Sequence, residues 1–105
     1  MGRKKSKASV SRSPPTTAVV MRLYIASGAP NSLQAVANLD AICKSRPRES
    51  FALEIIDVLK HPLRALADGI LVTPSLSKVS PKPMTRIIGN LSDVAAVLSA
   101  LGLQA

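Results

Sequence analysis

Short apolar runs of two kinds alternate along this chain, separated by proline, glycine and serine, and this alternation limits the folds that the chain can adopt. Residues 18–26 and 51–59 are rich in large and β-branched apolar residues, which is typical of strands. Between them, apolar residues recur from Ala35 to Cys43 at the 3.6-residue spacing of a helix. The pattern therefore predicts a strand, a helix over 32–45 and a second strand.

The second half of the chain contains shorter elements. His61 and Pro62 break the second strand, and residues 63–69 are long enough for two turns of helix, with Gly69 as the stop. Pro74 cannot donate a hydrogen bond to a neighbouring strand, so we expect a third strand to begin just after it.

The C-terminal part of the chain predicts a fourth strand and a last helix. Residues 84–88 alternate in polarity as a strand does, after a stiff proline-rich turn at 80–83. From Val94 to Leu101, apolar residues stand at i, i+3, i+4 and i+7, which predicts a terminal amphipathic helix. Helix caps are expected from Asn31 and Ser32 at the first helix and from Ser92 or Asn90 at the last.

These elements follow the order βαβαββα. A parallel strand-helix-strand unit followed by an antiparallel hairpin satisfies this order, which gives an α/β fold with a mixed four-stranded sheet and three helices in the thioredoxin-like arrangement. Glu54 and Asp57 interrupt the second strand, so we place that strand at a sheet edge. At 105 residues the chain has the length of one domain, which we assign to 18–105.

The first 17 residues differ from the rest in composition. The segment contains five basic residues, no acid and little to bury, so we predict a disordered basic arm over 1–17. The chain has a net charge of +8, and the arm holds most of it. A solubilising tail is the simplest interpretation, and attachment to nucleic acid or an anionic membrane is the alternative.

No residue pattern in the chain indicates an active site. Cys43 is the single cysteine and is expected to be a buried, inert thiol, which excludes a redox pair and fits the cytoplasm. His61 has no second histidine to share a metal, and Glu54 and Asp57 should project to opposite faces of their strand. We therefore expect no enzyme activity, no cofactor, no metal and no small-molecule substrate.

Three segments carry a family resemblance. LYIASGAPNS at 23–32, LEIIDVLKHP at 53–62 and ILVTPSLSKVSPKPMTRIIGNLSD at 70–93 strongly resemble the KaiB family of circadian clock proteins. The resemblance implies a non-enzymatic clock or stress-signalling adaptor that binds a KaiC-type ATPase ring. In a clock it also implies capture of KaiA or competition with a SasA-type kinase.

The resemblance also implies two alternative folds for one sequence. One is thioredoxin-like and able to bind; the other has the order βαββααβ and forms a tetramer. Where clock members often carry a tyrosine, a glycine and an aspartate, this chain has Val19, Ala100 and Gly102. Since alanine favours helix, we expect the terminal helix to continue through Ala100 and the thioredoxin-like monomer to be the stable form, with a tetramer as the alternative.

By the same resemblance, a KaiC-type partner would contact the segment from Lys60 to Pro74, with Leu63, Ala67, Asp68, Val72 and Thr73 as the contact residues. Pro74 occupies the position at which thioredoxin-like folds place a cis-proline, so we expect a cis bond there. Glu54 stands where relatives commonly have a basic residue, which argues against capture of KaiA at that strand.

Overall fold

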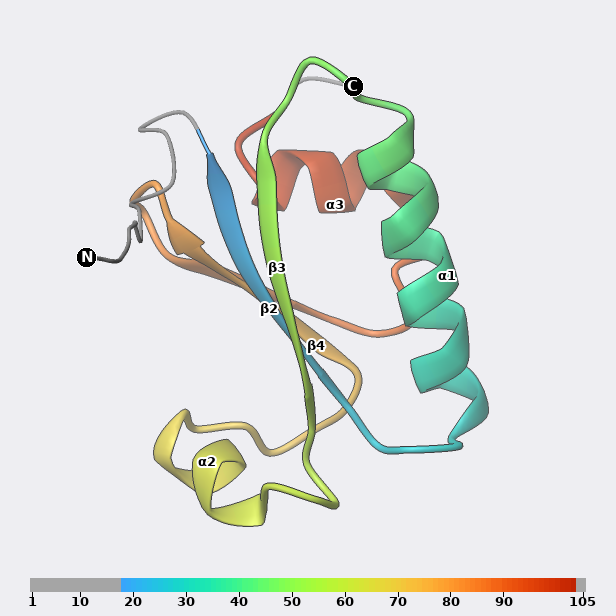
Figure 1. The fold of residues 1–105 in the computed structure, drawn as a ribbon, viewed down its shortest axis with the longest axis vertical. Helices are drawn as coiled ribbons and strands as arrows, with labels where there is room; N and C mark the ends of the chain where they lie inside the picture. The colour runs from blue at the N-terminus through green and yellow to red at the C-terminus, as the bar shows by residue number, and fades with distance from the viewer. Residues whose placement is uncertain (1–17, 104–105) are drawn as a thin grey trace, which may run out of the picture.

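The computed structural model describes residues 18–103, and the predicted basic arm at 1–17 lies outside the described residues. The element order is the predicted βαβαββα (Figure 1). The elements are β2 (Val19–Ile25), α1 (Pro30–Lys44), β3 (Phe51–Asp57), α2 (Pro62–Ala67), β4 (Ser75–Ser80), β5 (Thr85–Ile88) and α3 (Val94–Ala100).

The four strands form one mixed sheet in the order β3-β2-β4-β5. β2 and β3 are parallel, with Val19 opposite Phe51 and Ile25 opposite Asp57. β4 is antiparallel to both β2 and β5. β3 is therefore an edge strand, as its two acidic residues predicted.

Side chains that alternate along β2 bury themselves in two different cores. Met21 and Leu23 point to the face that α1 and α3 cover, where they pack with Leu39 and Val97. Tyr24 points to the opposite face, which α2 covers, and packs there in a small cluster with Ile56, Ala65 and Ile70. Figure 1 shows α1 and α3 close together, with α2 at the far end of the sheet. Helices on both sides of a mixed sheet are the layers of the predicted thioredoxin-like fold.

Both predicted helix N-caps were wrong. α1 begins at Pro30 after Ala29, because proline already has helical φ and lacks the N–H that a cap would satisfy. The Ser32 hydroxyl instead accepts a hydrogen bond from the Ala26 amide at 3.0 Å. α3 is capped by Asp93, whose carboxylate accepts a hydrogen bond from the Ala96 amide at 3.1 Å.

The end of α3 agrees with the prediction for this segment, since the helix continues through Ala100. Gly102 follows with φ of 77°, a conformation that glycine adopts without steric cost. Its amide donates to the Ser99 carbonyl at 3.0 Å, and the Leu103 amide donates to the Leu98 carbonyl at 2.8 Å. This pair of bonds is a Schellman motif, which stops the helix.

Candidate partner-docking surface

α2 exposes its large apolar side chains and buries a small one. The helix has six residues, and Ala65 is its buried residue. Leu63 and Leu66 lie on its outer side, with exposed fractions of 79% and 67%. A helix at the surface of a globular protein normally turns its large apolar residues toward the core. In α2 these residues face solvent instead.

The exposed apolar surface continues on both sides of α2. Leu59 precedes the helix and is exposed, and Leu71 and Val72 follow it, with Leu71 at 89% exposure. We call the five residues Leu59, Leu63, Leu66, Leu71 and Val72 the leucine surface. These side chains make the segment a candidate interaction site, because large exposed apolar patches are typical of such sites.

The expected contact residues differ in how exposed they are. Leu63, Ala67 and Val72 are exposed, and Thr73 is half-buried. Asp68 is half-buried as well, but its carboxylate points at the sheet and accepts a hydrogen bond from the Tyr24 hydroxyl at 2.8 Å. Asp68 therefore anchors the segment.

The chain reverses direction into β4 at a buried proline. Pro74 directly precedes this strand, and the Thr73–Pro74 peptide bond is cis. Pro74 accepts a hydrogen bond from the Gly89 amide at 3.0 Å through its carbonyl. This places the end of the leucine surface directly beside the sheet.

Arg64 ties α2 to the edge strand. Its two terminal nitrogens donate to the two carboxylate oxygens of Glu54, at 2.6 and 2.8 Å. The hydrogen bonds from Arg64 hold the pKa of Glu54 below its usual value and, in return, raise the pKa of Arg64. Bidentate pairs of this kind fix orientation as well as distance.

Tyr24 and Arg22 bind the other end of α2 from β2. Besides the Tyr24 bond to Asp68, Nη1 of Arg22 lies 3.9 Å from the same carboxylate. Nε of Arg64 lies 3.7 Å from it. Burial, followed by the hydrogen bond to Asp68, raises the pKa of Tyr24, so the phenol stays protonated and donates.

Arg86 reaches α2 from β5. Its guanidinium donates to the carbonyls of Asp68 and Gly69, at 3.1 and 3.2 Å, and to the Ser77 hydroxyl at 3.2 Å. A cation at the last carbonyls of a helix satisfies orphan acceptors and opposes the negative end of the helix dipole.

Gly69 ends α2, as predicted, by the same motif that ends α3. Its φ is 72°, its amide donates to the Leu66 carbonyl at 3.1 Å, and the Ile70 amide donates to the Ala65 carbonyl at 2.9 Å. Ile70 and Ala65 both belong to the small core beneath α2. The stop turns the chain so that Ile70 is buried and Leu71 is exposed.

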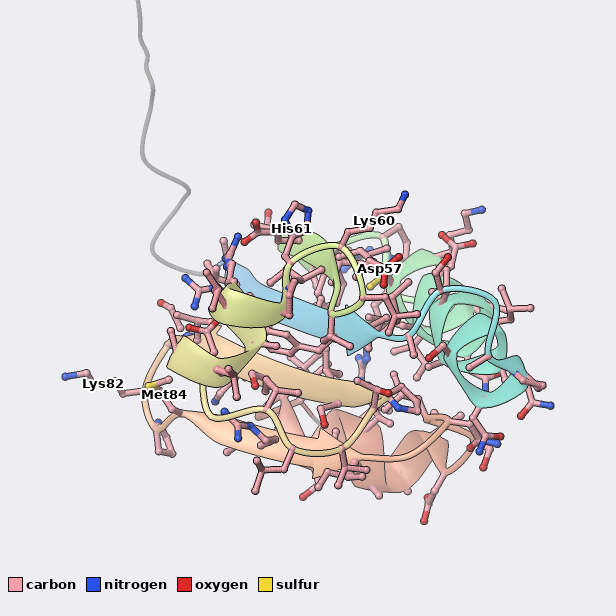
Figure 2. All side chains as sticks on the ribbon, turned by 90° about the horizontal axis from the view of Figure 1, so that it is seen from below. Asp57, Lys60, His61, Lys82 and Met84 are labelled. Atoms are coloured by element: carbon pink, nitrogen blue, oxygen red, sulfur yellow. The ribbon has the colours of Figure 1, made fainter. Side chains whose placement is uncertain are left out.

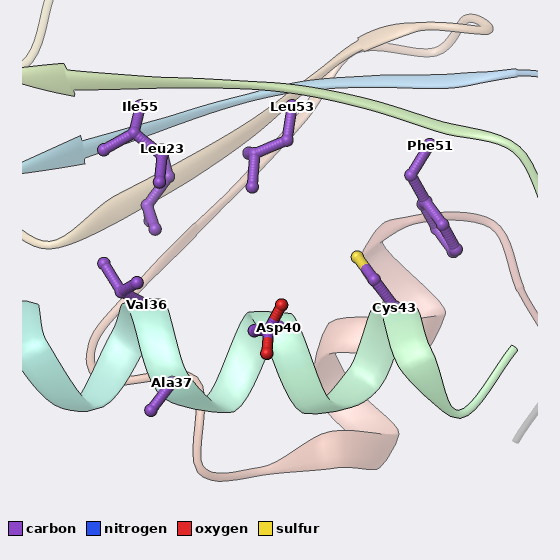
Figure 3. A pocket seen from close by; sticks show the side chains of 8 residues that line it. All are labelled: Leu23, Val36, Ala37, Asp40, Cys43, Phe51, Leu53 and Ile55. Atoms are coloured by element: carbon purple, nitrogen blue, oxygen red, sulfur yellow. The ribbon is translucent and has the colours of Figure 1, made fainter.

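A separate apolar groove of about 400 Å³ runs between α1 and the edge strand β3. Figure 3 shows Leu53 and Ile55 of β3 above Val36 and Asp40 of α1, with Cys43 toward one end. Burial, and then Asp40, raises the pKa of Cys43, so the thiol remains protonated and weakly nucleophilic. Cys43 is half-buried and lines this groove, so the expectation of a fully buried thiol was wrong.

The remaining titratable residues near α2 have structural roles or lie in solvent. Figure 2 shows His61 and Lys60 projecting outward near Asp57. One Asp57 oxygen accepts hydrogen bonds from the amides of Leu59 and Ser27, at 3.0 and 3.3 Å. Within residues 18–103, no group of three metal-binding side chains comes together, and no helix there is both long and apolar enough to span a bilayer.

Sequence reasoning missed Leu59, Leu66 and Leu71, together with the pairing of Glu54 with Arg64. A helix of six residues is too short to have a readable periodicity, so its outward side could not be predicted. The spacing of Leu63 and Leu66 was the available signal, because residues three apart share a helix face.

Solved structures identify the class of the fold. The N-terminal domain of Synechococcus elongatus SasA aligns with a TM-score of 0.68 at 22% identity, over 90% of this chain and 93% of that chain. Chloroplastic thioredoxin z aligns with a TM-score of 0.66 at 18% identity, over 88% of this chain and 81% of that chain. The protein is therefore a thioredoxin-like domain, and its loop before α1 contains no cysteine.

Sequence comparisons then identify the family. The KaiB domain model matches residues 22–103. Circadian clock oscillator protein KaiB of Prochlorococcus marinus (strain MIT 9313) is 46% identical over 89 residues, which cover 85% of this chain and 75% of that protein. KaiB of Trichodesmium erythraeum (strain IMS101) is 45% identical over 91 residues, covering 87% and 88%. The chain belongs to the KaiB family, a family of circadian clock proteins.

Proposed function

We propose that this protein is a non-enzymatic clock or stress-signalling adaptor of the cytoplasm that binds a KaiC-type ATPase ring through the leucine surface. The outward orientation of α2 is the observation that carries the proposal. Leu63 and Leu66 gain nothing from folding while they stay in water, and burying them against a partner would recover that apolar contribution. Ala67, Val72 and Thr73 extend the contact along the same segment.

We further propose that the thioredoxin-like monomer is the stable, binding-competent form. Val19 is buried in the main core, Ala100 is the last residue of α3, and Gly102 closes that helix. Each residue suits the described topology, which supports a role for all three in selecting it.

A shared fold suggests competition for the ring. The N-terminal domain of SasA has the same thioredoxin-like arrangement, so a SasA-type kinase would present comparable surfaces to a KaiC-type partner. Capture of KaiA at β3 is a weaker proposal. Glu54 is occupied by Arg64 there, and the strand therefore offers a different surface charge from that of relatives with a basic residue.

Binding of a purified KaiC-type ATPase tests the proposed function. We expect Leu63→Glu combined with Leu66→Glu to weaken binding by about 100-fold or more, because two charges would enter an apolar contact. The control is Leu33→Glu, since Leu33 is 61% exposed on α1 and lies outside the surface. Equal affinity of the α2 double variant and the control variant would contradict the proposal.

A further inference from the structure

We propose that six polar residues, Arg22, Tyr24, Glu54, Arg64, Asp68 and Arg86, act together as a clasp that positions the leucine surface on the sheet. Within the clasp, Glu54 and Arg64 hold α2 in the orientation in which the leucine surface can contact a partner. This inference rests on the proposed function for its biological meaning, but the holding of α2 by the clasp is a property of the free chain.

α2 needs such support because its own stability is low. A helix of six residues is far below the length of about 12 at which isolated helices become even marginal in water. Ala65 is its buried apolar residue, and the nearby Ile70 adds one more large side chain. The leucines that could have anchored the helix face solvent instead.

The clasp provides anchors from three strands. Glu54 of β3 holds Arg64 near the start of α2, Tyr24 of β2 holds the Asp68 carboxylate, and Arg86 of β5 holds the Asp68 and Gly69 carbonyls. Restraints at both ends of a short helix fix its rotation about its own axis. That rotation decides whether leucines or Ala65 face outward.

The signs of the charges make Glu54 the central residue of the clasp. Arg22 and Arg64 both approach it, with Nε of Arg22 at 3.7 Å and Nη1 of Arg64 at 2.6 Å. Asp68 is the second anion of this group, 3.9 Å from Arg22 and 3.7 Å from Arg64. A neutral residue at position 54 would leave the two guanidinium groups to share this one carboxylate, and a basic residue would add a third positive charge. Either change would weaken the attraction that holds α2 to β3.

Amide hydrogen exchange of the free full-length chain tests the clasp without any partner. The amides of Ala65, Asp68, Gly69 and Ile70 all donate within α2 or its stop, so they report undocking of this helix. We expect Arg64→Met to speed their exchange about fivefold, since methionine keeps the helix propensity and removes the charge. Glu54→Gln should act similarly, and the double variant should cost less than the sum of the two, because both variants remove the same Glu54–Arg64 pair.

Asp40→Asn is the matched control. It removes an ion pair of 2.9 Å with Lys44 that lies within α1, and α1 packs in the main core rather than in the small core beneath α2. This variant should leave exchange at residues 65–70 unchanged. Equal exchange in the wild type and Arg64→Met would overturn the clasp, as would an equal response to Asp40→Asn.

The ATPase separates this inference from the proposed function. Faster exchange in Arg64→Met together with no binding of a KaiC-type ATPase by the wild type would retain the clasp and reject the function. Normal binding by the wild type with unchanged exchange in Arg64→Met would retain the function and reject the clasp.

Discussion

The two faces of the sheet differ in how much apolar surface they bury. On the face under α1 and α3, large apolar side chains such as Met21, Leu23 and Leu39 are fully buried. On the face under α2, the apolar contact is small, and charged groups hold the helix. The first face sets the topology, and the second presents apolar residues that its own contacts do not use.

α2 and α3 differ in the same way, since they end alike but bury different amounts of apolar surface. Both end at a glycine with positive φ in a Schellman motif, Gly69 for α2 and Gly102 for α3. α3 contributes Val97 and Leu98 to the main core, whereas α2 contributes Ala65 to the small one. The same local stop therefore ends a helix that contributes to the main core and a helix whose large apolar side chains face solvent.

Replacing one leucine by alanine on each face should give the largest difference in the free energy of unfolding. Leu39→Ala should lower the free energy of unfolding by about 3 kcal/mol, because it removes a fully buried side chain and leaves a cavity. Leu63→Ala should change it by about 0.5 kcal/mol or less, since Leu63 lies in solvent. Urea unfolding of both variants measures the difference, and similar losses would contradict the distinction between the faces.

Tyr24→Phe tests the polar side of the comparison. The substitution keeps the buried ring and removes the donor to the Asp68 carboxylate, so we expect a loss of about 1.5 kcal/mol. Urea unfolding gives the total, and amide exchange at residues 65–70 should locate the loss at α2. No acceleration there would show that the hydroxyl does not hold the helix.

Substituting the glycine that ends α2 or α3 should lower the free energy of unfolding by similar amounts, but should speed amide exchange in different parts of the chain. Gly69→Ala and Gly102→Ala each place a Cβ at positive φ, which costs about 1 kcal/mol. We expect Gly69→Ala to speed amide exchange around α2 alone, whereas Gly102→Ala should also affect amides of the main core. Exchange mapped over the described residues distinguishes the two patterns, and identical maps would remove the contrast.

Protonation of Glu54 at low pH should weaken the attachment of α2 to the sheet, and we expect this effect to be smaller than those of the substitutions above. Arg22 and Arg64 approach Glu54 from two elements, with Asp68 nearby, and the hydrogen bonds from Arg64 lower its folded pKa. The contribution of the pair is therefore complete above the unfolded pKa of about 4.3 and is lost as pH falls through the folded value. After correction for intrinsic exchange rates, wild type and Glu54→Gln should converge at residues 65–70 below this range. A difference that persists unchanged at pH 2 would contradict the assignment.

The sequence predicted the order of the elements because strands, helices and breakers had distinct patterns. Edge strand β3 followed from Glu54 and Asp57, and the stop at Gly69 followed from its place after a short apolar segment. The prediction for the start of α1 was wrong because Pro30 can begin a helix without a side-chain cap.

The candidate site was less predictable than the fold. Leu63 and Val72 came from family resemblance, and neither the rotation of α2 nor the anchoring role of Asp68 was visible in the sequence. The bond from Glu54 to Arg64 joins residues ten positions apart in different elements. Such pairs depend on tertiary packing, which no local pattern encodes.

The fold of the C-terminal half in solution decides whether the thioredoxin-like monomer is the stable form. Nuclear Overhauser contacts between β4 and β5, where Leu76 lies opposite Ile87, should appear in a species with the mass of one 11.0 kDa chain. We expect these contacts together with helical chemical shifts over Val94–Ala100. A stable tetramer with strand at residues 97–102 would contradict this expectation.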